Sequence, residues 1–348
     1  MKVAFACDTM NAGGAERVVS TLANSFANLG HEVSIVMVGK DADDSFYQLD
    51  DSINLETVFS RANSNIGFLK RAKIFKETLL SINPDIVISF LSYVCIYTWW
   101  ALKNTNIPYI VSERNDPNKR SKFKQFLLNR AFRKASGCVF QTEDAFDWYK
   151  RIVRNKSTII HNPVTLTYFP EHIEKRKKQI LYVGRFSEQK NCLLLVKAFS
   201  KFLTKHPDYS LKMYGDGNTK DDIIKYIVDN KLDKKVFIES PSKTWQKDEC
   251  NSSLFVLPSN YEGMPNVLAE SLCLGIPSVS TDCPIGGPKE LKKLFPNLLL
   301  LCKTNDVDDL VEKMEKALEI KNNKPFIPNE LNSDYIANKW LEFINKMI

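Results

Sequence analysis

The chain has 348 residues, of which 44% are hydrophobic and 26% are charged, and its formal net charge at pH 7 is +7. This composition is typical of a globular protein long enough for two domains, and it excludes collagen-like, low-complexity and disordered chains. The eight cysteines are scattered without a C-x-x-C pair, and several lie in apolar runs such as GCVF at residues 137–140. The pattern predicts free thiols in a reducing cytosol rather than a disulfide framework.

The first apolar run, KVAFAC, ends at Asp8 and is too short for the apolar region of a signal peptide, so a first strand is expected there. Residues 86–102 carry no charge and reach the lower length limit of a membrane span. Three hydroxyl residues interrupt this stretch, and a buried strand followed by an apolar helix explains it equally well. We expect the strand and the helix.

Thirteen short β-branched, aromatic or aliphatic runs are predicted strands. They are KVAFACD, VSIVMV, INLETVF, DIVISF, YIVSE, GCVFQ and STIIHN, then QILYVGR, SLKMYG, KVFIES, LFVLPS, PSVST and LLLLC. Helix-length segments separate most of them, which predicts parallel sheets covered by helices. Thirteen strands are too many for one open sheet, and residues 160–179 combine two prolines with a charge cluster.

We therefore predict an α/β protein with two doubly wound, Rossmann-like domains that face a central cleft. The expected bounds are residues 1–164 and 165–332, and a helix at 333–348 is expected to pack back toward the first domain. Ligands bind at the carboxyl ends of the strands in such sheets, and the polar motifs of this chain follow predicted strands.

The strongest chemical motif is NYEGMPNVLAESL at residues 260–272, directly after the predicted strand LFVLPS. Glu262 is expected in the loop and Glu270 in the helix, roughly 12 Å apart along the axis, which is comparable to a sugar nucleotide. One carboxylate could hold hexose hydroxyls and the other ribose hydroxyls. The tight turn and the free N–H groups at the helix start suit a diphosphate, with the proline in the first helical turn. The residues expected at that turn are Gly263, Met264, Pro265 and Asn266. Two exposed helix glutamates would also explain the spacing.

Two further motifs follow predicted strands and precede predicted helices. GRFSEQKN (184–191) places Arg185 and Lys190 beside a helix start, where two cations suit a leaving diphosphate. MNAGGAER (10–17) places Gly13 and Gly14 where the backbone can approach a phosphate or a sugar. Each motif alone also fits an ordinary strand–turn–helix connection.

The excess positive charge is concentrated in FLKRAKIFK (68–76) and KRSKFKQFLLNRAFRK (119–134). Aromatic and aliphatic residues alternate with the cations, which suits helices lying on an anionic membrane surface. A solvated helix face that packs its apolar side on the core explains the pattern equally well. A nucleic-acid partner is not expected, because no known binding module is present.

Together and in this order, these motifs resemble the retaining family 4 glycosyltransferases of the GT-B fold, especially those that build bacterial surface polysaccharides and lipid-linked oligosaccharides. The likeness covers nearly the whole chain. It rests on GGAER, SERNDP (112–117), IHNPV (160–164), GRFSEQKN, YGDGN (214–218), LFVLPSNYEGMPNVLAES and GIPSVSTDCPIGGPKE (275–290). The likeness implies a cytoplasmic enzyme, peripheral on the inner face of the membrane. It would use a UDP-linked hexose or N-acetylhexosamine as donor and a polyprenyl-diphosphate saccharide as acceptor, in O-antigen, capsule or similar synthesis.

By the same likeness, Glu262 lies near the donor hexose, Glu270 holds the ribose, and Arg185 with Lys190 stabilises the diphosphate. Gly13 and Gly14 would lie against the donor phosphates. The resemblance further implies an α linkage formed by front-face attack, with the leaving phosphate oxygen taking the acceptor proton.

The chain departs from the family at Arg114. Many relatives carry a histidine there that contacts the donor sugar or the acceptor, whereas a guanidinium stays charged and cannot act as a general base. No protein base is therefore assigned, and Arg114 is expected to bind substrate. Asp116 is a candidate acceptor contact, with helix capping as the favoured alternative.

A metal ion is not expected. DADD (41–44) could form a D-x-D metal site, but it follows only the second strand, and the basic pair already offers charge for the diphosphate. The four histidines show no metal-ligand spacing. Two other functions remain open: a sugar-nucleotide epimerase of the same fold, and a non-catalytic sugar-nucleotide-binding protein.

Overall fold

The computed structural model describes residues 1–39, 45–58, 67–114, 116–153, 155–171, 173, 175–321 and 324–348. These residues form two compact units. Unit 1 contains Met1–Pro163 together with Asn329–Ile348, and unit 2 contains Val164–Pro328. The first division lies one residue from the predicted 164/165 border, and the chain returns to unit 1 four residues before the predicted 333.

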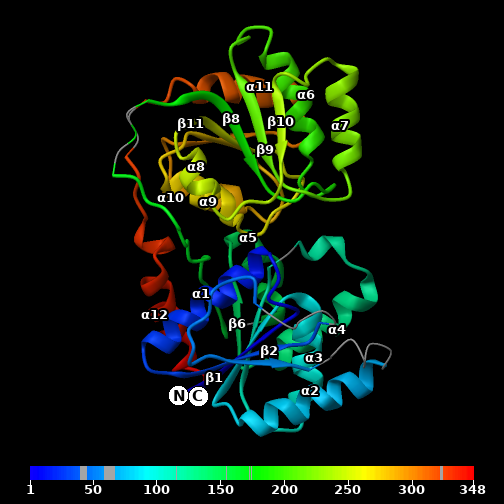
Figure 1. The fold of residues 1–348 in the computed structure, drawn as a ribbon. Coiled ribbons are helices and arrows are strands. Elements are labelled where there is room, and N and C mark those ends of the chain that lie inside the picture. The colour runs from blue at the N-terminus through cyan, green and yellow to red at the C-terminus, as the bar shows by residue number, and fades with distance from the viewer. Residues whose placement is uncertain are drawn as a thin grey trace. The chain divides into compact units, whose positions relative to one another are not determined.

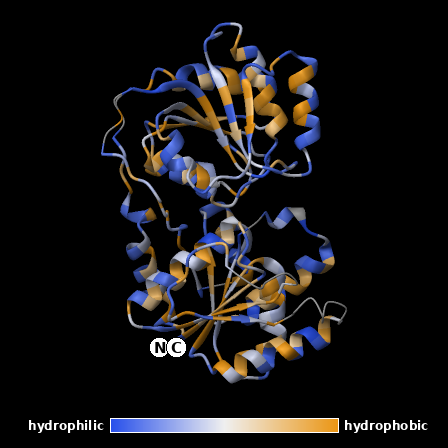
Figure 2. Ribbon diagram, in the orientation of Figure 1, coloured by the Kyte–Doolittle hydropathy of each residue, from blue (hydrophilic) through white to orange (hydrophobic). Residues whose placement is uncertain are grey.

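Unit 1 is built on a seven-stranded parallel sheet with the order β3-β2-β1-β4-β5-β6-β7 (Figure 1). The strands are β1 (Lys2–Cys7), β2 (Glu32–Met37), β3 (Asn54–Thr57), β4 (Ile86–Phe90), β5 (Tyr109–Ser112), β6 (Gly137–Phe140) and β7 (Ser157–Ile159). The strand order reverses between β1 and β4, which makes this pair the topological switch point. The central strands read as nearly continuous apolar runs because helices cover both faces of such a sheet, and Figure 2 shows them mostly in the hydrophobic colour.

The helices of unit 1 are α1 (Gly14–Asn28), α2 (Phe68–Ile82), α3 (Ser92–Leu102), α4 (Lys122–Lys134), α5 (Glu143–Val153) and α12 (Ser333–Ile344), with short 3-10 turns η2 (Pro117–Lys119) and η3 (Asn329–Leu331). The C-terminal helix α12 is part of the core. Its Trp340 is fully buried, with its ring 5.9 Å from that of Phe90, and Phe90 lies 6.2 Å from Phe5.

The uncharged stretch at residues 86–102 folds as the buried strand β4 followed by α3, as predicted. Helix α3 packs between α2 and α4. Within the described parts of the chain, no helix has the length and apolar character needed to cross a bilayer. All eight cysteines are free thiols, and seven of them are buried.

Unit 2 has a six-stranded parallel sheet with the order β10-β9-β8-β11-β12-β13. Its strands are β8 (Lys177–Val183), β9 (Ser210–Tyr214), β10 (Val236–Glu239), β11 (Ser252–Leu257), β12 (Ser278–Thr281) and β13 (Leu299–Cys302). Its helices are α6 (Cys192–Phe202), α7 (Lys220–Asp229), α8 (Trp245–Glu249), α9 (Asn266–Cys273), α10 (Gly287–Leu294) and α11 (Val307–Ala317). The order reverses between β8 and β11. All thirteen predicted strands are present, and the α/β class with two doubly wound sheets is confirmed.

Candidate active site

The motif around Glu262 lies at the carboxyl end of β11, at the switch point of unit 2. The Glu262 carboxylate is buried, and its Oε1 accepts hydrogen bonds from Lys190 Nζ at 2.6 Å and Ser259 Oγ at 2.6 Å. The Lys190 and Glu262 side chains are only 16% and 7% exposed. The two motifs that the sequence analysis assigned to one donor site therefore meet in a largely buried ion pair.

Hydrogen bonds between two loops hold Lys190 beside Glu262. The loop after β8 turns tightly at Ser187, whose carbonyl accepts the N–H groups of Lys190 and Asn191. The backbone N–H of Asn260 donates to the Gln189 carbonyl at 2.8 Å, and Asn191 Nδ2 donates to Asn260 Oδ1 at 3.1 Å. Asn191 has φ 48°, a left-handed conformation that asparagine tolerates better than most residues. Amide side chains thus join the GRFSEQKN and NYEG loops.

The structure does not place the predicted basic pair symmetrically. Lys190 contacts Glu262, whereas the Arg185 side chain is exposed. The Arg185 carbonyl accepts hydrogen bonds from the Tyr182 hydroxyl at 3.0 Å and from Cys192 Sγ at 3.8 Å. Burial, with a smaller effect of Glu262, raises the pKa of Cys283 to about 12. The Cys283 thiol therefore stays protonated at neutral pH and is a poor nucleophile.

The start of α9 follows closely packed backbone. Pro265 precedes the helix instead of lying in its first turn as predicted, and its carbonyl accepts the N–H groups of Leu268 and Ala269, both at 3.1 Å. A Cβ added at Gly287 would lie 1.5 Å from the Gly263 carbonyl oxygen, so the backbones of the two glycines are in direct contact. Met264 is 5% exposed and Asn266 is the first helical residue.

Glu270 lies inside α9 and is 1% exposed. Its Oε2 accepts a 3.0 Å hydrogen bond from Gln246 Nε2, and Gln246 is itself held by the Thr167 N–H and hydroxyl at 2.6 and 2.9 Å. The alternative interpretation, that both glutamates are exposed helix charges, is therefore wrong, because Glu262 and Glu270 are both buried. Sequence reasoning missed Gln246 and Ser259. Ser259 stands three residues before Glu262, but the position of Gln246 in α8 carries no recognisable pattern.

The glycine motif of unit 1 opens α1, as predicted. Gly13 is the N-cap residue, and Tyr47 Oη donates to its carbonyl at 2.8 Å. A Cβ on Gly13 would lie 2.1 Å from Glu16 Oε2, so the Glu16 carboxylate lies against Gly13, just before the helix starts at Gly14. An acidic group is favoured near a helix N-terminus, and a phosphate bound there would have to displace Glu16 or share the end of the helix with it.

Arg114 lies at the carboxyl end of β5 and is 8% exposed. Its Nη1 donates to Asn162 Oδ1, and its guanidinium carbon is 4.5 Å from the ring centroid of Phe90. Asp116 is also buried, and its Oδ1 accepts the Asn118 N–H at 2.9 Å at the start of η2. Asp116 is therefore a capping residue, the alternative that the sequence analysis favoured over a substrate contact.

Two family models match the chain in succession: Glycosyltransferase Family 4 at residues 12–168 and Glycosyl transferases group 1 at residues 166–338. The chain belongs to glycosyltransferase family 4. It is 27% identical over 371 residues to the Campylobacter jejuni GalNAc-α-(1→4)-GalNAc-α-(1→3)-diNAcBac-PP-undecaprenol α-1,4-N-acetyl-D-galactosaminyltransferase, covering 99% of this chain and 98% of the relative. It is 26% identical to the lipopolysaccharide 1,6-galactosyltransferase of Salmonella typhimurium, covering 96% and 95%.

Solved glycosyltransferase structures confirm the GT-B fold of this family 4 member. The lipopolysaccharide outer core galactosyltransferase WaaB in its apo form matches with a TM-score of 0.76 and 21% identity over 100% of both chains. Anabaena Alr3699/HepE in complex with UDP matches with a TM-score of 0.79 and 14% identity over 99% of this chain and 100% of the other. The predictions of family and fold are both confirmed.

The expectation that this family 4 chain needs no metal ion stays a prediction. Among the described residues, no group of three or more histidine, cysteine, aspartate or glutamate side chains is placed to hold a metal ion. The DADD segment at 41–44 lies outside the described residues.

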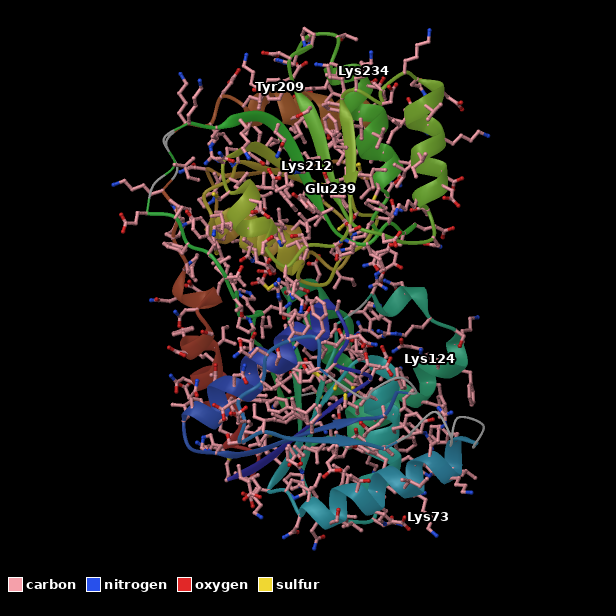
Figure 3. The ribbon with its side chains drawn as sticks, viewed as in Figure 1. Lys73, Lys124, Tyr209, Lys212, Lys234 and Glu239 are labelled. Atoms are coloured by element: carbon pink, nitrogen blue, oxygen red, sulfur yellow. The ribbon has the colours of Figure 1, made fainter. Side chains whose placement is uncertain are left out.

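The two basic segments have different surfaces. In α4, Leu128, Ala131 and Phe132 are buried, whereas Phe123 and Phe126 are 72% and 53% exposed. In α2, Lys73 lies on the outer side and pairs with Glu77 at 3.8 Å (Figure 3). The core-packing interpretation therefore explains only part of the α4 pattern.

Proposed function

We propose that the protein is a retaining glycosyltransferase that moves a hexose or N-acetylhexosamine from a UDP-sugar to a polyprenyl-diphosphate-linked saccharide and forms an α linkage. The buried Lys190–Glu262 pair at the switch point of unit 2 carries this proposal. The Campylobacter and Salmonella relatives support the choice of acceptor class, because their names specify an undecaprenol-linked saccharide and lipopolysaccharide.

In the proposed reaction, the bond between sugar C1 and the diphosphate oxygen breaks, and a bond forms between C1 and an acceptor hydroxyl oxygen. The acceptor proton passes to the leaving phosphate oxygen, so no protein base is needed. Lys190 has three N–H donors and can keep its bond to Glu262 while donating to the diphosphate. Arg185, exposed at the same loop, adds a second cation, so we propose that no metal ion is required.

The two glutamates take different roles in this proposal. Glu262, next to Lys190, accepts hydrogen bonds from hexose hydroxyls. Glu270 accepts from ribose hydroxyls, and Gln246 fixes its orientation through the 3.0 Å hydrogen bond. Gly13 and Gly14 approach the donor phosphates in this proposal.

We also propose a place of action on the cytoplasmic membrane face, with α4 as the main contact. Its sequence, KFKQFLLNRAFRK, has no acidic residue, and its outer face presents Phe123 and Phe126 among cations. Arg130 lies 4.8 Å from the Phe126 ring centroid, so charge and ring are adjacent. Such a face can insert rings among lipids while the cations bind anionic headgroups.

Turnover with and without acceptor tests the function. The protein is incubated with a labelled UDP-sugar, alone and with a polyprenyl-diphosphate saccharide, and both nucleotide release and sugar products are analysed. Acceptor-dependent UDP release with an α-linked product supports the proposal. An isomerised donor would indicate an epimerase, and donor binding without turnover would indicate a binding protein. The Arg185→Ala, Lys190→Ala double variant should fold with a lowered Tm, because buried Glu262 loses its cation, and it should lose most product formation.

A further inference from the structure

Arg114 is a buried cation at the carboxyl edge of the unit 1 sheet. Its described contacts are neutral on the guanidinium side: Nη1 donates to Asn162 Oδ1, and the guanidinium lies over the Phe90 ring. The Nε atom is fully buried and has no hydrogen-bond partner. Arginine offers five N–H donors in a planar arrangement, and the buried Nε–H donor is unused.

The neighbouring carboxylate is already engaged elsewhere. Glu113 is 1% exposed at its side chain and accepts a 2.7 Å ion-pair bond from Arg120 Nη2 and a 3.0 Å bond from the Tyr149 hydroxyl. Its Oε1 also accepts the Arg114 backbone N–H at 2.8 Å, and its negative charge partly offsets the cost of burying the Arg114 guanidinium. Among the described residues, no carboxylate forms an ion pair with the Arg114 guanidinium.

The surrounding residues hold the guanidinium in place without neutralising it. Asn162 Oδ1 also accepts a 2.5 Å hydrogen bond from Gln141 Nε2, and both residues are 4% exposed. Gln141 follows β6 and Asn162 follows β7, so both lie at the same edge of the sheet as Arg114. Two donors converge on one neutral oxygen, which fixes the position of Arg114 without giving the guanidinium an ion-pair partner.

A buried charge without an ion-pair partner is costly, because close pairing with an opposite charge is what offsets most of its desolvation. Burial lowers the pKa of Arg114 to about 9, yet the group remains charged at neutral pH. A buried polar group without a partner is rare, and a bound ion or a functional role is one explanation of it. The carboxyl edge of a doubly wound sheet is where ligands bind.

We propose that Arg114 is the centre of an oxyanion subsite that binds a phosphate or carboxylate group of the substrate. This inference rests on the proposed transfer reaction, which supplies the biological ligand. It adds the negative charge of the substrate as a determinant of specificity. The two sources of such an oxyanion are the diphosphate of the lipid-linked acceptor and the carboxylate of an acidic sugar. A neutral side chain at this position could not select for either.

The test measures ligand-induced shifts of Tm and binding by calorimetry on the full chain in the Arg185→Ala, Lys190→Ala background. That background removes the proposed donor cations, so failure of the donor assignment does not affect the outcome. The probes are inorganic pyrophosphate, D-glucuronate and, as neutral control, D-glucose. Arg114→Met is compared with Arg151→Met, which removes an exposed arginine of α5.

At least one oxyanion should bind, and Arg114→Met should weaken it by about 10- to 100-fold, as expected for a charge-assisted hydrogen bond. Arg151→Met should leave binding unchanged, and glucose should not bind. Without ligand, Arg114→Met should also raise Tm, since it removes an unpaired buried charge, whereas a structural role predicts a lower Tm. Pyrophosphate binding alone identifies a substrate diphosphate as the source, and glucuronate binding alone identifies an acidic sugar.

Should the methionine variant fail to fold, Arg114→Lys provides a second measurement. Lysine keeps the positive charge but lacks the planar set of guanidinium N–H donors. It should retain part of the oxyanion response. Equal binding by wild type and folded Arg114 variants, or no oxyanion binding by the parent background, would overturn the proposal.

Discussion

Buried charged side chains at the carboxyl ends of the two sheets have different kinds of partner. In unit 2, Lys190 and Glu262 neutralise each other at 2.6 Å, and Glu270 is held by an amide at 3.0 Å. In unit 1, the described contacts of the Arg114 guanidinium are a neutral oxygen and an aromatic ring. The cation of the first edge thus has an ion-pair partner without ligand, whereas Arg114 forms no ion pair with any described residue.

This difference bears on how each edge responds to substitution. A paired charge leaves an unpaired partner behind when it is removed, so changes in unit 2 should cost both stability and activity. An unpaired charge leaves nothing behind, so its removal should cost binding alone. Stability and activity measured on the same variants can therefore separate the two edges.

The largest effect is expected for Glu262→Gln. The amide keeps a hydrogen-bond acceptor for Ser259 and Lys190 but loses the charge, so kcat/KM for transfer should fall about 100- to 1,000-fold, as for other preorganised electrostatic groups. In a cycle with Lys190→Met, the two losses should be strongly non-additive, because each variant abolishes the same ion pair. Additive losses would show that the pair does not act as a unit, and wild-type activity of Glu262→Gln would refute its assigned role.

The same contrast separates the features that the sequence predicts from those that it does not. The thirteen strands, the division near residue 164 and the proximity of Lys190 to Glu262 could all be predicted, because periodicity and position after parallel strands determine them. The partners of buried groups could not be predicted. Gln246 meets Glu270 across 24 residues, and Asn162 meets Arg114 across 48, so tertiary packing alone decides these contacts.

The next largest effect is expected for membrane binding by the exposed rings of α4 in unit 1. Phe123→Ser with Phe126→Ser should weaken binding to phosphatidylglycerol vesicles by about 10-fold or more, because two exposed rings lose their burial in lipid. Cosedimentation measures it, with phosphatidylcholine vesicles as the uncharged control. Leu69→Ser is the matched variant on α2, where the leucine is 64% exposed and Lys73 is paired with Glu77. Equal losses from both helices would show that α4 is not the main contact, and unchanged binding of the double variant would remove it from the interface.

A smaller effect is expected for Gln246→Leu. The Glu270 carboxylate would lose its 3.0 Å donor, so the KM for the nucleotide sugar should rise by about 10-fold while kcat changes little. The Tm should fall as well, because Thr167 loses both of its bonds to the Gln246 side chain. Steady-state kinetics with varied donor provides the measurement. A fall in kcat at unchanged KM would place Gln246 in the chemical step rather than in nucleotide binding.

The smallest effect is a pH dependence at the switch point of unit 1. Asp8 follows β1 and accepts a hydrogen bond from the Tyr93 hydroxyl, and burial raises the pKa of its carboxyl above the ordinary value. A raised folded-state pKa means that protonated Asp8 is favoured in the folded protein, so its stabilising contribution is complete below the ordinary aspartate pKa and is lost as pH rises through the folded value. Asp8→Asn keeps an acceptor for Tyr93 and cannot ionise. Its unfolding midpoint in denaturant should therefore exceed that of the wild type at neutral pH, and the gain should disappear in acid. A gain that is independent of pH would show that ionisation of Asp8 is not its cause.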